Sequence, residues 1–413
     1  FLTGQNTYTG GTDVQAGLLE VDGSVAGPVS VHSGAVLAGQ GSVGQTTVYS
    51  GASLLPGSTA TGGMLSVTGN LNMEAGSTLL ANSVSSTQEL VHVTGTASLS
   101  GGTVQILGSQ RLQYGEQYKV LTAANGVTGR YDTVKYDQYG EYPFLSPTLL
   151  YTSDSVNLQL LRNSVPFSAF AQTRNQQAAG NGLQSVGVAN PVVQAVVQLS
   201  GAGEIHGALD ALSGEIHASA RTVLIQDSLY VRQAVVDRLA GALCDGGFAG
   251  TGQRVVQVRH GHVVDEGECV PERAALWGEA YGGFGSNGGD GNAAGLHHST
   301  AGFVMGVDTP LGADGRWRMG GVLSYGRSMM EGDTHSSSGQ SNNVTLGGYG
   351  GTHWGRWNLR LGASYTWNML SLNRTVAFPG FGNTLSSHYN GGTAQGFGEL
   401  GYRLRMRGAM LEP

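Results

Sequence analysis

The sequence has little charge and almost no cysteine. Asp, Glu, Lys and Arg make up 12% of its 413 residues, which is about half of the share usual in soluble domains. The formal net charge is −7, and the first basic residue is Arg111. Because no basic stripe is present to neutralise phosphates, we expect no nucleic-acid partner.

Long apolar runs are also missing. No stretch of about 18 consecutive apolar residues occurs, which excludes a transmembrane helix. Glycine contributes 69 residues and proline only 10, and the glycines lack the strict three-residue period of collagen. Abundant Gly with Ser and Thr favours many short strands joined by tight turns. The chain opens with Phe1 and shows no signal peptide, so we interpret it as a fragment or a processed product.

Residues 1–110 contain an internal repeat in which Val and Leu recur at similar offsets from a glycine. The repeat glycines are Gly17, Gly34, Gly51 and Gly76. Steps of this size predict the coils of a right-handed parallel β-helix, with alternate apolar residues inside and glycine at the corners. The alternative, a flexible Gly/Ser-rich linker, would not place apolar residues at repeating offsets. Residues 111–165 are richer in large apolar residues and are predicted to cap the exposed end of the stack.

Residues 166–243 change to a helical pattern. From Ile216 onwards, apolar residues recur at i, i+3 and i+4 spacing, which predicts a helix of about 28 residues and about 42 Å. That length would cross the apolar band of an outer membrane, which is roughly 25 Å thick. The helix also carries several charged residues, so it cannot face lipid.

Beyond a Gly- and charge-rich loop at residues 244–273, residues 274–413 alternate between apolar and polar. From Trp357 to Trp367 the odd-numbered positions are apolar and the even-numbered positions are polar or small. About six such strands, each of about ten residues, predict an antiparallel transmembrane β-barrel with polar groups facing the lumen. A soluble antiparallel sandwich is the alternative, but its strands are usually shorter. All five tryptophans fall here, as aromatic girdles require: Trp277, Trp317, Trp354, Trp357 and Trp367.

Short motifs follow the order of these parts. Residues 5–12 read QNTYTGGT, residues 118–131 begin YKVL and end GRY, residues 212–219 read LSGEIHAS, and residues 277–282 read WGEAYG. They resemble, in turn, the transport repeat, the pertactin-like autochaperone region, the linker and the translocator barrel of type V autotransporters of Gram-negative bacteria. The resemblance covers nearly the whole chain, so the expected fold is all-β with a helical linker.

The resemblance implies self-directed secretion. Residues 274–413 would form the N-terminal half of a translocator barrel in the Gram-negative outer membrane. The β-helix would be a passenger that passes through the pore and folds at the cell surface or outside the cell. The implied partners are outer-membrane lipid, the barrel assembly machinery, periplasmic chaperones, and a host surface or extracellular substrate.

The same resemblance puts the predicted helix inside the finished pore. The pore-helix candidates are Ile216, Arg221, Asp227, Arg232, Asp237 and Arg238. Candidates for facing groups in the lumen are Glu279, Asp308, Arg318, Arg360, Glu399 and Arg403. The helix charges are expected to pair with such groups, among them Glu279, Arg360, Glu399 and Arg403.

One departure from the family pattern concerns the end of the chain. The family barrel has about a dozen strands and ends in an aromatic residue, whereas about six strands are visible here and the chain stops at Pro413. A half barrel would leave two open edges in lipid. We therefore expect a truncated fragment or a damaged gene, and the translocator function does not carry over to this chain by itself.

No catalytic motif, cofactor or metal site is expected in this segment. Residues 260–269 bring together His, Asp, Glu and Cys side chains, but their spacing matches no recognised metal-ligand pattern, so a solvated loop is favoured. Cys244 and Cys269 are expected to form a structural disulfide in the oxidising periplasm. The only Asn-Asn pair, Asn342-Asn343, is expected in a barrel loop and gives no support for cleavage of the pore helix.

We therefore interpret the chain as the passenger end and the partial translocator barrel of an autotransporter secretion module, which mediates export and surface display of the passenger. This segment is not expected to be an enzyme. An alternative is that the parent protein is a surface hydrolase with a subtilisin-like serine protease or esterase domain upstream, because passenger repeats of this type occur with such domains. A third hypothesis is an adhesin whose β-helix binds host surfaces.

Overall fold

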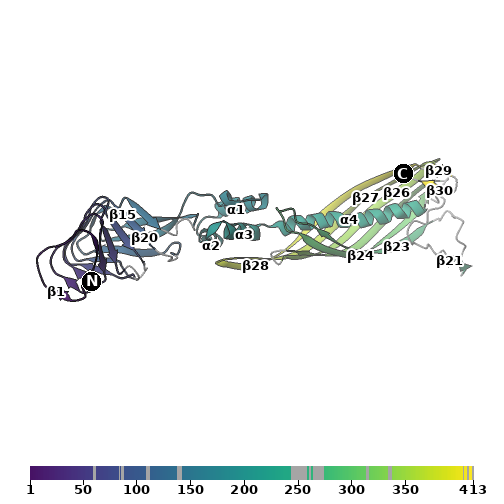
Figure 1. The fold of residues 1–413 in the computed structure, drawn as a ribbon. Helices are drawn as coiled ribbons and strands as arrows, with labels where there is room; N and C mark the ends of the chain where they lie inside the picture. Colours follow the sequence, from purple (N-terminus) through teal and green to yellow (C-terminus); the bar gives the residue numbers. More distant parts are fainter. Residues whose placement is uncertain are drawn as a thin grey trace. The chain divides into compact units, whose positions relative to one another are not determined.

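The computed structural model describes residues 1–58, 62–82, 84, 88–107, 112–136, 142–242, 258–259, 262–263, 274–312, 316–333, 337–402, 404–406 and 409–411. They form two compact units, which are treated separately below. The first contains residues 1–210 with residues 378–381, and the second contains residues 211–377 with residues 382–413. Figure 1 shows the course of the chain through both.

The N-terminal unit begins with a stack of coils, each of which adds one strand to each of three parallel sheets. The first sheet contains β1 (Gln5–Asn6), β4 (Ser24–Val25), β7 (Ser42–Val43), β10 (Leu65–Val67), β13 (Val91–Val93) and β16 (Gln117–Ala123). The second contains β2 (Thr12–Val14), β5 (Val29–Val31), β8 (Thr46–Val48), β11 (Leu71–Met73), β14 (Ala97–Ser100) and β17 (Val127–Arg130). The third contains β3 (Gly17–Glu20), β6 (Ala35–Gly39), β9 (Ser53–Pro56), β12 (Thr78–Ala81), β15 (Thr103–Ile106) and β18 (Thr133–Tyr136).

The apolar repeat of the sequence produces columns of side chains inside the coils. Val25, Val43, Val67 and Val93 are in register from one coil to the next, and each is at most 1% exposed. The four repeat glycines have φ angles of 75°, 80°, 77° and 80°, which a residue with a Cβ adopts only under strain. The predicted parallel β-helix, with glycine at its corners, is therefore confirmed.

An antiparallel hairpin covers the last coil. β19 (Leu145–Tyr151) pairs with β20 (Ser155–Arg162), which in turn pairs antiparallel with β16. Phe144 is fully buried beneath it, and the Arg162 guanidinium lies 5.2 Å from the centre of the Phe144 ring. Burial raises the pKa of the Tyr131 phenol well above its usual range. The hairpin occupies the edge of β16, so a further parallel strand cannot add there.

Four helices follow in this unit. They are η2 (Phe167–Phe170), α1 (Arg174–Val186), α2 (Pro191–Val197) and α3 (Gly201–Leu212), the last of which ends at the boundary with the second unit. Thr173 and Asn190 cap α1 and α2 by accepting bonds from the Gln176 and Val192 amides, at 3.1 and 2.9 Å. Among the described residues, no helix is long and apolar enough to cross a membrane.

The second unit contains the long helix α4 (Glu215–Ala242) and a six-stranded sheet in sequential order. The sheet contains β23 (Ala275–Asn287), β24 (Leu296–Leu311), β25 (Trp317–Gly332), β26 (Ser338–Trp354), β27 (Trp357–Phe378) and β28 (Phe381–Tyr402). Two small pairs also occur: β21 (Val258–Arg259) with β22 (His262–Val263), and β29 (Leu404–Met406) with β30 (Ala409–Leu411). The antiparallel membrane sheet expected from the alternation is thus present.

The strands are longer than the expected length of about ten residues. They span 13 to 22 residues, because polar stretches that resemble loops in the sequence continue the strands. Asn342-Asn343 was expected in a loop, but it lies inside β26, where Asn343 is buried. His297-His298, which looks like a polar turn, lies in β24.

Candidate functional site

The outward face of the sheet carries an apolar belt. Phe303, Tyr325, Val344 and Trp367 are aligned across four neighbouring strands. Eight residues earlier on β25 lies Trp317, which is 47% exposed. At about 3.4 Å per residue and a strand tilt of about 40°, Trp317 and the row that contains Tyr325 lie roughly 20 Å apart along the membrane normal. That separation is smaller than the apolar band of an outer-membrane protein, which is roughly 25 Å tall, so both positions fit within the band.

Trp277 does not belong to this belt, contrary to the sequence interpretation. Its side chain is half-buried against the inward cluster, and its indole Nε1 donates a hydrogen bond to the Tyr349 hydroxyl at 2.6 Å. On the same strand, Leu276 and Phe284 face outward instead and are 77% and 95% exposed. Trp277 is therefore a lumen residue.

Helix α4 lies along the inward face of the sheet and packs against it through two apolar clusters (Figure 1). The first cluster joins the start of the helix to β24, β25 and β27: Ile216, Ala220, Val223, Leu296, Met330, Leu370 and Leu372. The second joins its later half to β24, β25 and β26: Val231, Ala234, Val235, Leu239, Val304, Val322 and Tyr349. Burial of these side chains fixes which face of α4 meets the wall.

A buried charged network lies near the C-terminal end of α4, and we call it the Asp308 network. The Asp308 carboxylate accepts bonds from Arg238 Nε at 2.9 Å and Nη2 at 3.0 Å. It also accepts bonds from Arg318 Nε at 2.5 Å and the Tyr349 hydroxyl at 2.8 Å. Trp277 completes the chain through Tyr349. Because Asp308 is only 2% exposed, its charge depends on these donors for compensation.

A second polar contact lies at the middle of the helix. The Ser328 hydroxyl on β25 donates to the Asp227 carboxylate at 2.5 Å, and the Asn343 amide donates to Ser328 at 3.0 Å. Tyr230 of α4 stacks on Tyr281 of β23, with ring centres 4.8 Å apart. The polar middle of α4 therefore matches a polar stretch of the wall.

The first turn of α4 is held at three points, which we call the elbow clamp. Arg374 of β27 donates to the backbone carbonyls of Ala211 at 3.2 Å and Ser213 at 2.7 Å. The Glu215 carboxylate accepts a bond from the Ala294 amide at 3.1 Å. His217 Nδ1 lies 3.1 Å from the Tyr389 hydroxyl of β28. The clamp thus ties the chain to β27, to β28 and to the turn before β24 as the chain enters the helix.

The candidate residues of the sequence analysis fall in several places. Asp227, Arg238, Asp308 and Arg318 take part in the contacts above, and Ile216 is in the first apolar cluster. Of the other helix candidates, Arg221 and Asp237 are exposed and Arg232 is half-buried. The Asp237 carboxylate accepts a hydrogen bond from the Gln233 side chain at 3.3 Å. Glu279 is half-buried on the inward face of β23.

Arg360 pairs with Glu399 from strand to strand. Arg403, Cys244 and Cys269 lie outside the described residues, as do the side chains of the proposed loop cluster at residues 260–269. The sequence interpretation does not include Tyr349, Ser328 or Arg374. Ser328 and Arg374 are an even number of residues from the lumen candidates Arg318 and Arg360 on the same strands, whereas β26 has no lumen candidate from which Tyr349 could be placed.

The two ends of the sheet differ. At the end where α4 stops, belt residues Trp354 and Trp357 directly flank the two-residue turn between β26 and β27. At the elbow-clamp end, β27 continues from Trp367 to Phe378 beyond the belt. Outer-membrane barrels have short periplasmic turns and longer extracellular extensions. The elbow clamp therefore marks the extracellular end.

A parallel β-helix joined through a linker to a membrane sheet with a helix on its inner face defines the secreting end of an outer-membrane protein. Residues 276–413 match the family described as "Autotransporter beta-domain", so the chain carries an autotransporter β-domain. This confirms the resemblance for residues 276–413, which match the part of an autotransporter that lies in the outer membrane and serves secretion.

Two curated relatives are each described as "Extracellular serine protease" from Serratia marcescens. One is 28% identical over 463 residues, covering 100% of this chain and 42% of the relative. The other is 27% identical over 462 residues, covering 99% of this chain and 42% of the relative. The chain therefore spans about two fifths of the length of the curated relatives it matches.

Proposed function

We propose that α4 is the pore helix of the translocator and that the Asp308 network holds it in place after export. The single observation that carries this proposal is the buried contact of Arg238 with Asp308, at 2.9 and 3.0 Å. A charge pair of this kind forms only when helix and wall are both in position. Its formation would therefore mark the end of translocation.

The elbow clamp supports the same proposal at the extracellular end. Arg374 offers its positive charge to carbonyls at the C-terminus of α3, where the helix dipole is negative. The clamp and the Asp308 network lie at opposite ends of α4, so the helix is held at both. In the complete barrel, a helix fixed in this way would fill the lumen and anchor the exported chain to the membrane.

Folding of the β-helix outside the cell would supply the drive for export. Folded proteins gain roughly 0.1 kcal/mol per residue, and each coil adds buried apolar columns to the one before it. Residues 1–243 contain no cysteine, so no disulfide within that stretch opposes threading. We propose residues 111–165 as the autochaperone cap, since their hairpin provides the covered edge on which coils stack.

We further propose the following division of the chain: residues 1–110 as passenger coils, 166–243 as the helical linker, 244–273 as a loop closed by a Cys244–Cys269 disulfide, and 274–413 as barrel strands. The barrel assembly machinery and periplasmic chaperones would be the partners during insertion. The match of residues 276–413 to an autotransporter β-domain supports an outer-membrane setting for these proposed partners.

The second candidate function concerns the whole protein. Both curated relatives are described as extracellular serine proteases, so we propose that the parent of this chain carries a protease domain upstream. The segment itself would then be the secretion and display part, without catalytic residues. The alternative parent is an adhesin that binds a host surface, and an Asp, His and Ser constellation in the upstream reading frame would distinguish the two.

The experiment that tests the main proposal is surface display of the full-length protein in a Gram-negative host. Protease added to intact cells should remove the passenger and leave a membrane fragment that migrates differently before and after heating. Asp308→Ala should weaken the protection of α4 in that fragment, whereas Asp237→Ala, on the exposed face, should not. Recovery of the protein in a detergent-free soluble fraction would refute the proposal.

A further inference from the structure

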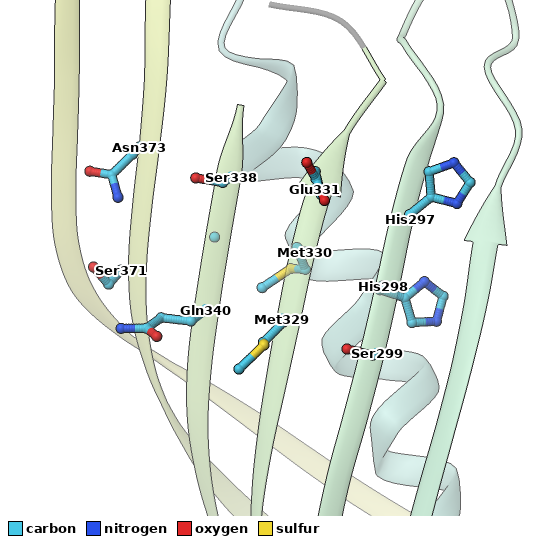
Figure 2. A pocket seen from close by; sticks show the side chains of 11 residues that line it. His297, His298, Ser299, Met329, Met330, Glu331, Ser338, Gln340, Ser371 and Asn373 are labelled. Carbon is cyan, nitrogen blue, oxygen red and sulfur yellow. The ribbon is translucent and has the colours of Figure 1, made fainter. Parts of the chain in front are cut away.

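A hollow of about 660 Å3 lies on β24–β27 towards the extracellular end. Its polar lining combines neutral hydroxyl and amide groups with the Glu331 carboxylate and two imidazoles. The neutral groups belong to Ser299, Ser338, Gln340, Ser371 and Asn373, and the imidazoles to His297 and His298. Figure 2 shows these side chains on neighbouring strands, with a helix passing behind the sheet. Among the lining residues, Met330 also belongs to the first apolar cluster against α4, whereas the five hydroxyl and amide residues do not.

Most of the lining faces outward. Ser299 pairs with Met329, and Gln340 pairs with Ser371. On their strands, Met329 and Ser371 lie four residues beyond Tyr325 and Trp367, whose row ends the apolar belt. Met329 is 53% exposed. A molecule in this hollow would therefore meet hydroxyl and amide groups at one end and the aromatic belt at the other.

One exposed cation lies between the belt and the hollow. Arg327 occupies the row between Tyr325 and Met329, and its Nη2 donates to Gln340 Oε1 at 2.5 Å. At this height on the outward face, Arg327 is level with the charged part of a lipid headgroup. A phosphate there would gain a charge-assisted hydrogen bond from the guanidinium.

We propose that this hollow binds the phosphorylated sugar headgroup of a glycolipid in the outer leaflet, with its acyl chains along the aromatic belt. An amphiphile is required because the site is continuous with apolar surface. Sugar hydroxyls suit the neutral Ser, Asn and Gln groups, which both donate and accept hydrogen bonds. The inference rests on placement of the β-domain in the outer membrane and goes beyond the secretion function.

The test uses full-length protein purified from outer membranes and reconstituted into phosphatidylethanolamine vesicles with or without rough lipopolysaccharide. The measurement is the lipopolysaccharide retained per protein after extraction and affinity purification. The double variant Gln340→Leu with Ser371→Leu should lower retention about tenfold, because several hydrogen bonds to the headgroup are lost. Arg327→Gln should lower it as well, and Arg327→Lys should restore most of it.

The matched control is Asn383→Leu, which replaces an exposed polar residue of β28 that does not line the hollow. It should retain lipopolysaccharide like the wild type. Heat-modifiable migration verifies that each variant has folded, and passenger display on cells separates this site from the secretion function. Equal retention in all variants, or equally strong binding of a soluble sugar phosphate without acyl chains, would overturn the proposal.

Discussion

The β-helix and the membrane sheet use the same alternation of residues in opposite senses. Leu54 of the β-helix points into the coil and is 0% exposed, whereas Leu361 of the sheet points outward and is 45% exposed. In the coil, burial removes apolar surface from water. In the sheet, lipid covers the outward face, so that face can remain apolar without packing against protein. The period of a strand therefore does not reveal which side is the core.

The two interiors also differ in chemistry. The coil interior consists of stacked Val, Leu and Ala columns, which need no hydrogen-bond partners. The inner face of the sheet buries Asp308, Arg318 and Arg360 at 2%, 4% and 6% exposure. Buried charges are costly unless they are paired, so the sheet interior depends on specific partners. We expect the sheet to be more sensitive to loss of one polar group than the coil is to loss of one methyl group.

The largest effect is expected at the Asp308 network. Asp308→Ala leaves Arg238 and Arg318 buried without their carboxylate, which should cost about 4 kcal/mol in stability of the folded β-domain. The measurement is the urea concentration at which the heat-modifiable form of the full-length protein is lost. Asp237→Ala is the control, since Asp237 is exposed on the same helix. If both variants behaved alike, the network would not hold the helix.

The next effect compares two leucines directly. Leu54→Ala should lower the free energy of unfolding of the passenger by about 3 kcal/mol, because it leaves a cavity in the packed coil. Leu361→Ala, in lipid, should change the stability of the β-domain by less than about 1 kcal/mol, because acyl chains fill the space. Urea unfolding followed by protease resistance of each part tests this. Similar losses at both sites would contradict the opposite polarity of the two regions.

Much of this architecture could be predicted from the sequence because both regions repeat. Gly17, Gly34 and Gly51 mark the coil corners, and the alternation from Trp357 to Trp367 sets the faces of β27. The prediction that Trp277 belongs to an aromatic girdle on the outward face is wrong, and the position of Glu279 in the sequence already argues against it. Trp277 lies two residues from Glu279, and a strand places both on one side. Treating every tryptophan as a girdle residue therefore conflicted with the lumen assignment of Glu279.

Other features depend on register, which the sequence does not specify. The contact of Arg238 with Asp308 requires the rotation of α4 and the pairing of β24 with β25 to be known together. The strand lengths were underestimated because residues 338–342 lie above the belt, where water on the outward face removes the apolar signal. The elbow clamp joins Arg374 to backbone carbonyls, which leave no trace in the side-chain pattern.

An intermediate effect is expected at the elbow clamp. Arg374→Met keeps much of the side-chain volume but removes the bonds to the Ala211 and Ser213 carbonyls. Loss of two charge-assisted bonds should weaken local structure by about 2 kcal/mol. Limited proteolysis of the α3–α4 junction on intact cells should become roughly tenfold faster or more, while the Asp308 network at the far end stays protected. Arg374→Lys, which keeps one donor, should be intermediate; a rate equal to the wild type in Arg374→Met would rule out a clamp.

The smallest effect concerns helix α2, which is neither a coil strand nor a belt strand. The Asn190 side chain accepts a bond from the Val192 amide at 2.9 Å, and Pro191 begins the helix. Asn190→Ala removes this N-cap and should cost about 1 kcal/mol locally, whereas Asn190→Ser retains a capping oxygen and should cost little. Hydrogen exchange of the α2 amides in the full-length protein should become about fivefold faster in the alanine variant alone. Equal acceleration in the serine variant would mean that side-chain volume, and not capping, stabilises this helix. The result would then show whether the helices between the two regions are held by local backbone contacts or by packing, as the coils are.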